Sequence, residues 1–393
     1  MKIAVVGGAG KVVWGAIRDF VENDSVEQLL LADLNLDVLE ERKRILCSDK
    51  VITGRVDLND HNDLVKLLDS YDVCLNATSH HFNLKVMAAC VESRTHYTDF
   101  GGLFHWARQQ LEMHESFKDA GITGIVGSGS APGIVNVMAR YGYDHLDEVY
   151  SVKILDGIVN FNLDPYKLIP PYAIDTLLDE FEMNPYEFKN GEFVEMWPFS
   201  GEEVVDFPVP VGRQKVINTI HSEVATIPLT FKDKGIRDVA FKLSLPTIFE
   251  EQLKFLVGVG LGSSKPVNVK GQDVVPRDLL AAVLREAKPT PVKQEKKHDD
   301  HKALRVEIVG KKDGQDGKYV LDTVISPYEK WSDMSQGVFS VGFPAAVTTR
   351  LLGSGQITKK GFFPSEAAID PKTYFKELEK RGIKVHASFI QQV

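Results

Sequence analysis

A glycine-rich segment follows directly on the first apolar run of the chain. Residues Ile3–Val6 are small or β-branched and apolar, and Gly7-Gly8-Ala9-Gly10 comes next. The residues from 11 to 22 then carry apolar side chains at helical spacing. A glycine loop between a strand and a helix lets the backbone approach a pyrophosphate, whose charge is met by the helix N-terminus. The segment therefore predicts a dinucleotide site with contacts from Gly8, Ala9, Gly10, Lys11 and Val12.

The glycines of this loop have different expected roles. Gly8 is expected to make the tight turn, and Gly10 to let the backbone approach the pyrophosphate. The third glycine of the dinucleotide fingerprint is replaced by Val13. Because that glycine normally permits close packing of helix on strand, we expect the helix to tilt or to lie slightly further out.

Two carboxylates stand at the ends of the next predicted strands. Asp33 lies 25 residues after Gly8 and ends the second strand. A carboxylate there can accept hydrogen bonds from both ribose hydroxyls of the adenosine half, and it repels a 2′-phosphate. No arginine lies in Leu34–Leu36, so we expect NAD in preference to NADP. Asp57, at the end of the third strand, is expected to meet the adenine amino group.

Small and polar residues follow the three later strands, at 76–81, 97–102 and 127–133. The carboxyl ends of parallel strands share one edge of the sheet, and ligands bind there. For each segment a structural role is the alternative, such as an N-cap for Asp99 or a surface position for the two histidines 80 and 81. We expect cofactor contacts from Asn76, Ala77, Thr78 and Ser130, and backbone donors to the substrate from Gly101 and Gly102.

Two other kinds of site are disfavoured by spacing. A short-chain dehydrogenase or epimerase needs a Tyr-x-x-x-Lys pair, and none of the eleven tyrosines has a lysine four residues on. Adjacent histidines such as His80 and His81 cannot easily bind one ion, and no carboxylate–histidine spacing completes a site. We therefore expect no metal.

Alternating strands and helices must position these residues. Over residues 1–130 short apolar runs alternate with helical segments, which predicts a doubly wound, Rossmann-like parallel sheet. After residue 127 the pattern changes: apolar residues recur at every second position from 150 to 154, and strand-like segments continue to residue 325. This predicts a second α+β domain with a mixed or antiparallel sheet.

Composition narrows the class of protein. The 393 residues carry 46 basic and 55 acidic side chains, a net charge of −9, so nucleic-acid binding is not expected. No apolar run is long enough to span a membrane. The three cysteines form no CxxC motif, which favours a reducing, cytoplasmic location.

The motifs together resemble the saccharopine dehydrogenase family, in particular its lysine 6-dehydrogenase-like and saccharopine reductase-like members. The similar stretches are VVGGAGKV, VCLNATSHHFN, HYTDFGG, GSGSAPGIVNVMARYG and, near the end, GFPAAVTTRLLGSGQITKKGFFPSE. The resemblance implies a Rossmann-like domain over 1–130, completed by C-terminal helices within 340–393. It also implies an inserted substrate and dimerisation domain over 131–339, and a homodimer.

The same resemblance implies NAD(P)-linked hydride transfer at a carbon–nitrogen bond of a small amino-acid substrate, lysine or saccharopine. Two alternatives stay open: a carboxyspermidine-type reductase, which joins an aldehyde and a polyamine in an acidic pocket, and a non-catalytic NAD sensor. Such chemistry needs a proton-transfer group with a pKa near 7. The candidates are His80, Tyr97 with Asp99, and His221 with Glu223, whose alternative is an exposed ion pair. Arg213 or Lys215 would hold a substrate carboxylate.

Overall fold

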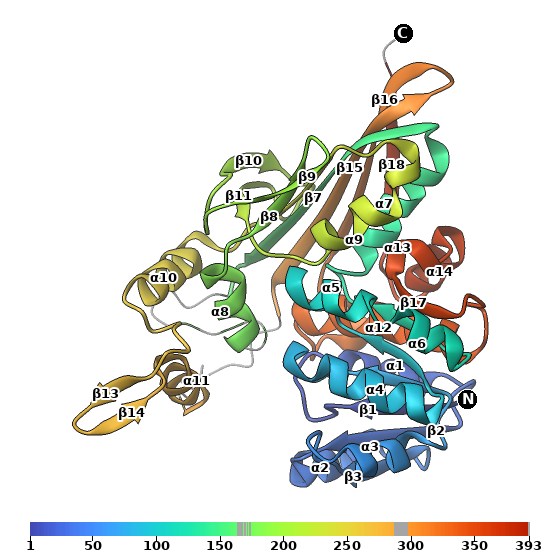
Figure 1. The fold of residues 1–393 in the computed structure, drawn as a ribbon, viewed down its shortest axis with the longest axis vertical. Helices are drawn as coiled ribbons and strands as arrows, with labels where there is room; N and C mark the ends of the chain where they lie inside the picture. The colour runs from blue at the N-terminus through green and yellow to red at the C-terminus, as the bar shows by residue number, and fades with distance from the viewer. Residues whose placement is uncertain (163–167, 169, 171, 173, 287–297, 392–393) are drawn as a thin grey trace.

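The protein folds into two α/β parts that meet along one junction (Figure 1). The computed structural model describes residues 1–162, 168, 170, 172, 174–286 and 298–391. The first part contains a parallel sheet and the second a larger mixed sheet, which confirms the predicted fold class.

Seven parallel strands form the first sheet, in the order β17-β6-β5-β4-β1-β2-β3. Most positions of these strands are buried, as expected for a parallel sheet covered on both faces. Their bounds are β1 Lys2–Val6, β2 Gln28–Asp33, β3 Val51–Arg55, β4 Val73–Asn76, β5 His96–Asp99, β6 Thr123–Val126 and β17 Gly361–Pro364.

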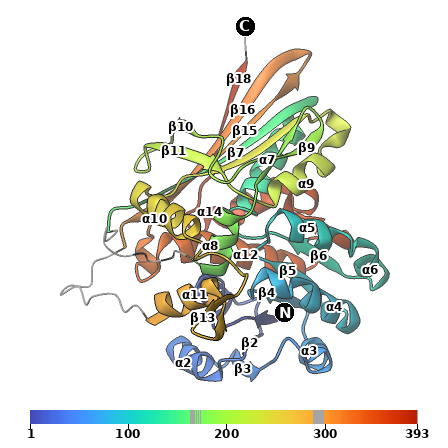
Figure 2. The same cartoon turned by 60° about the vertical axis from the view of Figure 1, so that its left-hand side comes forward.

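Helices cover both faces of this sheet (Figures 1 and 2). They are α1 Trp14–Glu22, α2 Leu36–Leu46, α3 His61–Leu68, α4 Asn83–Ser93, α5 Phe104–Leu111, α6 His114–Asp119, α12 Gln336–Gly353, α13 Ser365–Ala368 and α14 Pro371–Glu379. A short 3₁₀ helix, η1 (His80–Phe82), follows β4.

The helix after the glycine loop, α1, packs closely against helix α12. A Cβ added to Gly15 of α1 would lie 2.7 Å from the carbonyl oxygen of Val338 in α12. A Cβ on Gly342 of α12 would lie 2.7 Å from the backbone nitrogen of Ala16. Val13 is fully buried at the start of α1. Gly15 and Gly342 therefore permit close packing of α1 on α12, and the tilt of α1 against the sheet stays a prediction.

The second sheet runs in the order β10-β11-β12-β7-β15-β16-β18, and β8 and β9 join it beside β12. β7 pairs parallel with β12 and antiparallel with β15. The bounds are β7 Glu148–Asn160, β8 Tyr186–Lys189, β9 Glu192–Glu195, β10 Glu203–Asp206, β11 Arg213–Asn218, β12 Asp238–Leu243, β15 Asp300–Lys312, β16 Gln315–Ile325 and β18 His386–Gln391.

The remaining elements flank this sheet. α7 (Ile134–His145) and α9 (Glu223–Thr230) pack against strands β15 and β12, respectively. α8 (Ile174–Glu182) lies beside the junction of the two parts, and α10 (Thr247–Gly258), α11 (Pro276–Glu286) and the hairpin β13–β14 project from it (Figures 1 and 2). The hairpin strands are β13 Val267–Val269 and β14 Gln272–Val274.

The C-terminal segment contributes to both sheets. Residues 336–379 return helices and strand β17 to the first part, whereas β18 pairs antiparallel with β16 in the second. The sequence interpretation placed only helices from 340–393 on the first part and did not include either pairing. None of the described helices is long and apolar enough to cross a membrane.

Candidate functional site

A cleft lies at the carboxyl ends of the first-sheet strands, where β1 has β2 on one side and β4 on the other. The strand order reverses at this point, which is where dinucleotides bind in open α/β sheets. The cleft is lined by residues from the ends of four strands and from η1, among them Gly7, Gly10, Asp33, Asp57, Ala77, Thr78 and Phe82.

The tight turn of the glycine loop falls on Gly7, not on Gly8 as the spacing predicted. Gly7 has φ +84°, and a Cβ there would lie 2.7 Å from the carbonyl carbon of Ala77. Gly8 has no positive φ. The N–H groups of both residues donate to the carbonyl oxygen of Ala32 at 2.8 and 3.0 Å, which fixes the loop against β2.

Asp33 and Asp57 both line the cleft, as expected for contacts to the adenosine half. Asp33 Oδ2 accepts from the N–H of Ala9 at 3.1 Å, and its Oδ1 accepts from Asn35 N–H at 3.1 Å. Asp57 Oδ1 accepts from Asn59 N–H at 2.9 Å. Asp33 therefore positions the glycine loop while it faces the cleft.

Arg42 of α2 contacts the glycine loop. The search for an arginine near Asp33 covered only Leu34–Leu36 and did not include it. Its guanidinium donates to the carbonyl oxygens of Gly8 and Gly10, the second at 2.9 Å, and lies 5.2 Å from the ring centroid of Trp14. These bonds tie the loop carbonyls to α2. Lys11 and Val12 were also predicted to contact the cofactor. In the structure Lys11 is exposed and Val12 is half-buried.

We expect Asp33→Ala to reduce the preference for NAD over NADP, because it removes the carboxylate that would repel a 2′-phosphate. Dissociation constants for both cofactors, measured by calorimetry, check this. Asp57→Ala, in the same cleft, is the control and should weaken both cofactors alike. An unchanged NAD:NADP ratio in Asp33→Ala would place the determinant elsewhere.

The residues predicted at the ends of β4 and β5 form a buried network. Asp99 accepts from the N–H groups of Gly101 and Gly127 at 2.8 and 2.9 Å, and from the Tyr97 hydroxyl at 2.8 Å. Asn76 donates to that hydroxyl at 3.1 Å. Burial raises the pKa of Asp99 despite these donors. The structure thus gives Tyr97 and Asp99 a loop-positioning part, and their catalytic role stays a prediction.

The two glycines predicted to offer donors to substrate, Gly101 and Gly102, lie at the end of this network. Gly101 has φ +98°, and a Cβ there would lie 2.2 Å from Cγ of Pro132. A Cβ on Gly102 would lie 3.2 Å from Cβ of Trp106. The small residues therefore let the loops after β5 and β6 pack together, with the N–H of Gly101 held by Asp99.

A buried charged cluster lies where the second sheet meets the loop after β6. Lys302 Nζ on β15 lies 3.1 Å from Asp156 Oδ2 on β7 and 3.3 Å from Ser130 Oγ. His221 Nδ1 lies 2.8 Å from Glu223 Oε2. Glu180 of α8 accepts a hydrogen bond from the hydroxyl of Tyr172. Side chains of both parts thus converge at the junction.

The pairing of His221 with Glu223 is confirmed, and the pair is buried instead of exposed. Glu223 is the first residue of α9, so the start of this helix brings its carboxylate to the imidazole. The ring of His221 stacks on Phe241 with 3.7 Å between the centroids.

The cluster shifts the acid–base behaviour of its members. Burial raises the pKa of Asp156, and it raises the pKa of Glu180 to about 7. Burial opposes the charged form of His221, but the carboxylates of Glu223, Glu180 and Asp156 outweigh it and raise the pKa of the imidazole. Two carboxylate oxygens, Asp156 Oδ1 and Glu223 Oε1, are buried without a hydrogen-bond donor among the described residues.

His80 joins the cofactor cleft to α8. Its Nε2 lies 3.3 Å from Asp179 Oδ2, and Asp179 Oδ1 accepts from Arg277 at 2.8 Å. Ligand atoms of His80, His81 and Asp179 lie within 4.8 Å of one another, a grouping that the sequence interpretation had not foreseen. Because the guanidinium of Arg277 already neutralises Asp179, we interpret the group as an ion pair between the two parts. The absence of a metal stays a prediction.

Arg213 and Lys215, predicted to hold a substrate carboxylate, pair instead with acids of the second part. Arg213 lies 3.9 Å from Asp206, and its side chain is 74% exposed. Lys215 Nζ lies 3.0 Å from Glu250 Oε1. The structure does not bring either residue into the buried cluster, because β11 carries both toward β10 and α10.

The sequence interpretation missed Asp156, Glu180 and Lys302. Asp156 stands in the apolar stretch 154–159, and a charge within a buried strand signals either pairing or function. Lys302 and Asp156 become neighbours because β15 and β7 pair with Lys302 opposite Ile158 and Leu304 opposite Asp156. That register is not visible in the sequence.

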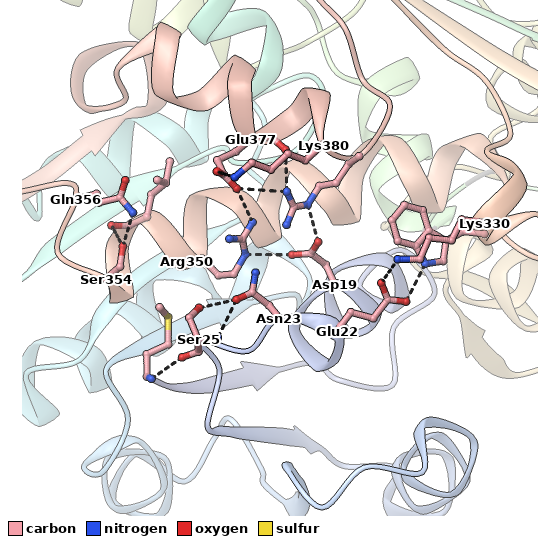
Figure 3. A pocket seen from close by; sticks show the side chains of 14 residues that line it. Asp19, Glu22, Asn23, Ser25, Lys330, Arg350, Ser354, Gln356, Glu377 and Lys380 are labelled. Carbon is pink, nitrogen blue, oxygen red and sulfur yellow. Dashed lines mark hydrogen bonds and ion pairs between the residues drawn. The ribbon is translucent and has the colours of Figure 1, made fainter.

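A second pocket lies at the other end of α1, away from the cofactor cleft (Figure 3). Asp19 accepts from Arg350 at 3.2 Å and from Arg381 at 2.6 Å, and Glu377 lies 3.5 Å from both guanidinium groups. These ion pairs join α1 to α12 and α14, so we assign them to holding the C-terminal segment on the first part.

A cleft at the switch point of one domain, joined to a second domain with a mixed sheet, defines a two-domain dinucleotide-binding protein. Two family models match the chain: the saccharopine dehydrogenase NADP binding domain over residues 3–125, and the saccharopine dehydrogenase C-terminal domain over residues 129–383. The chain belongs to the saccharopine dehydrogenase family of NAD(P)-binding oxidoreductases.

Individual relatives agree with this assignment. Carboxyaminopropylagmatine dehydrogenase of Synechocystis is 25% identical and is matched over 98% of this chain and 97% of its own. Carboxynorspermidine synthase of Vibrio alginolyticus is 24% identical and is matched over 98% of this chain and 96% of its own. The fold is shared with saccharopine dehydrogenase (L-Glu forming) of Saccharomyces cerevisiae, with TM-score 0.74, 18% identity and 99% of both chains covered. It is also shared with the homospermidine synthase of Legionella pneumophila in complex with NAD, with TM-score 0.68, 12% identity and 99% and 91% covered.

Proposed function

We propose that the protein makes or cleaves a carbon–nitrogen bond of a carboxylated polyamine with NAD or NADP. This is the carboxyspermidine-type alternative, here preferred over lysine or saccharopine as substrate. The observation that carries it is the acidic character of the junction next to the cofactor cleft. Among the described residues, Asp156, Glu180 and Glu223 gather there around two cationic groups, His221 and Lys302.

An acidic junction favours an amine over a carboxylate as the group that is bound there. Buried charges need a partner of opposite sign, and two carboxylate oxygens of the cluster have no donor among the described residues. An ammonium group supplies such donors. The cations predicted to receive a carboxylate, Arg213 and Lys215, lie elsewhere. The relatives named for carboxylated polyamines support the same substrate class.

The cluster offers the proton transfers that the reaction needs. NAD or NADP, when bound, would supply the hydride acceptor for the carbon next to the substrate nitrogen. The substrate ammonium must first lose a proton to give the free amine. Loss of the hydride then leaves an iminium group, which takes up water, releases a proton and separates into an aldehyde and an amine. We assign the proton transfers to His221, oriented by Glu223. Lys302 of the same cluster donates to Ser130 in the loop after β6, which we expect to contact the cofactor.

Absorbance at the reduced-nicotinamide band tests the proposal. Purified protein with NAD or NADP is mixed in turn with carboxynorspermidine, carboxyaminopropylagmatine, saccharopine, lysine and ornithine at mildly alkaline pH. We expect reduction of the cofactor with a carboxylated polyamine. Reduction with saccharopine or lysine alone would contradict the polyamine assignment. Cofactor binding without turnover on any compound would favour the sensor alternative. NAD in preference to NADP is proposed from Asp33, and the homodimer and the cytoplasmic location stay predictions.

A further inference from the structure

Two adjacent carboxylates of α8 meet different partners at the junction. Asp179 binds Arg277 of α11 and lies against His80 of the first part. Glu180 is buried, and His221, Lys302 and Asp156 of the second part are the charged groups that act on it most strongly. The ion pair of Asp179 therefore holds α8 in place, and it leaves Glu180 directed at the buried cluster.

Glu180 differs from the other carboxylates of the cluster in its partner. Asp156 is paired with the ammonium of Lys302, and Glu223 with the imidazole of His221. Among the described residues, Glu180 takes its hydrogen bond from the neutral hydroxyl of Tyr172. An ammonium group of a ligand would give Glu180 the ion pair that Asp156 and Glu223 already have.

On the basis of the function proposed above, we propose that Glu180 binds the terminal ammonium group of a linear diamine or polyamine substrate. The hydroxyl of Tyr172 orients the carboxylate, and the charge of His221, to which the proton transfers are assigned, acts on the same carboxylate. Glu180 would thus select substrates that carry a second amine at a distance from the reacting one.

A linked proton release is expected from this arrangement. Burial holds the pKa of Glu180 at about 7, so at pH 6.5 the free carboxyl carries its proton for much of the time. An ammonium group beside it favours the ionised form and lowers that pKa. Binding of a diamine at pH 6.5 should therefore release part of a proton, and binding at pH 8.5 should release almost none.

The experiment uses the full chain loaded with the reduced cofactor and titrates it in a calorimeter with putrescine or with 4-amino-1-butanol. The second compound replaces one ammonium by a hydroxyl. Titrations in two buffers of different ionisation enthalpy give the number of protons released. We expect Glu180→Gln to bind putrescine at least about tenfold more weakly, since it removes a charged partner. We also expect this variant to lose the proton release and to bind the cofactor as the wild type does.

Two variants serve as matched controls. Glu182→Gln neutralises another carboxylate of α8, which contacts Arg277, and should bind putrescine as the wild type does. Glu366→Gln removes a second buried carboxyl whose pKa burial raises to about 7, but which accepts from Asn136. This variant should keep the proton release.

Each outcome separates this assignment from the proposed function. Undiminished putrescine binding by Glu180→Gln would overturn the role of Glu180, even if carboxylated polyamines are turned over. Equal wild-type affinity for putrescine and 4-amino-1-butanol, or no binding of either, would overturn it as well. Loss of putrescine affinity in Glu180→Gln with no turnover of any carboxylated polyamine would support the amine site and contradict the proposed reaction.

Discussion

Replacing His221 by alanine should lower turnover at least about tenfold while NAD(P) affinity stays as in the wild type, because the variant removes a proton-transfer group worth ~10²–10⁴ in rate at most. The imidazole is buried, bonded to Glu223 and stacked on Phe241, and these contacts hold it in one orientation. It lies in the junction and not among the residues that line the cofactor cleft. Stopped-flow or steady-state absorbance, together with calorimetric cofactor titration, measures both quantities.

The pH profile separates proton transfer from a purely structural loss. The carboxylates around His221 raise its pKa, and Glu223 is the strongest of them. In the oxidative direction His221 must be neutral to accept a proton, so the rate rises with pH through that pKa. Glu223→Gln should lower the pKa of His221 and so move this rise in rate to lower pH. His61→Ala, at an exposed pair on α3, is the control and should change neither rate nor profile. Wild-type turnover in His221→Ala would falsify the assignment.

Replacing Gly7 by alanine should weaken NAD and NADP alike by at least about tenfold, because a left-handed alanine costs ~1–2 kcal/mol and the added Cβ cannot be accommodated where the loop now lies. That Cβ would meet the carbonyl carbon and oxygen of Ala77 at 2.7 and 2.8 Å. Both neighbours are backbone atoms of the cleft wall, so the loop must move out of its binding position. Calorimetric titration of the purified variant measures the loss.

Gly121 provides the matched control for this substitution. It also has a positive φ, +72°, but a Cβ there meets nothing within 4 Å. Gly121→Ala should therefore lose about 1–2 kcal/mol of unfolding free energy from backbone strain alone, with unchanged cofactor affinity. If Gly7→Ala binds the cofactor no worse than Gly121→Ala does, the close approach to Ala77 does not matter for binding.

The first domain could be predicted well from the sequence because its signals are local. A glycine loop next to an apolar run, and carboxylates at strand ends, lie within a few residues of the elements they define, so Asp33 and Asp57 do line the cleft. Right-handed crossovers then restrict the strand order. The predicted position of the tight turn was wrong by one residue. The turn lies at Gly7 and not at Gly8, because β1 ends at Val6.

The chemistry at the junction depended on the tertiary structure. Lys302 and Asp156 are 146 residues apart, and only the register of β15 on β7 makes them neighbours. Glu180 reaches the same place because Asp179 holds α8 against His80, and Arg42 reaches the glycine loop from the next helix. Local sequence patterns were enough to predict the class of fold and the cofactor cleft, and they named His221 and Glu223 as partners, although the start of α9 is what brings the two side chains together. The charge of the junction could not be predicted in this way, since that charge is the sum over side chains brought together by long-range packing.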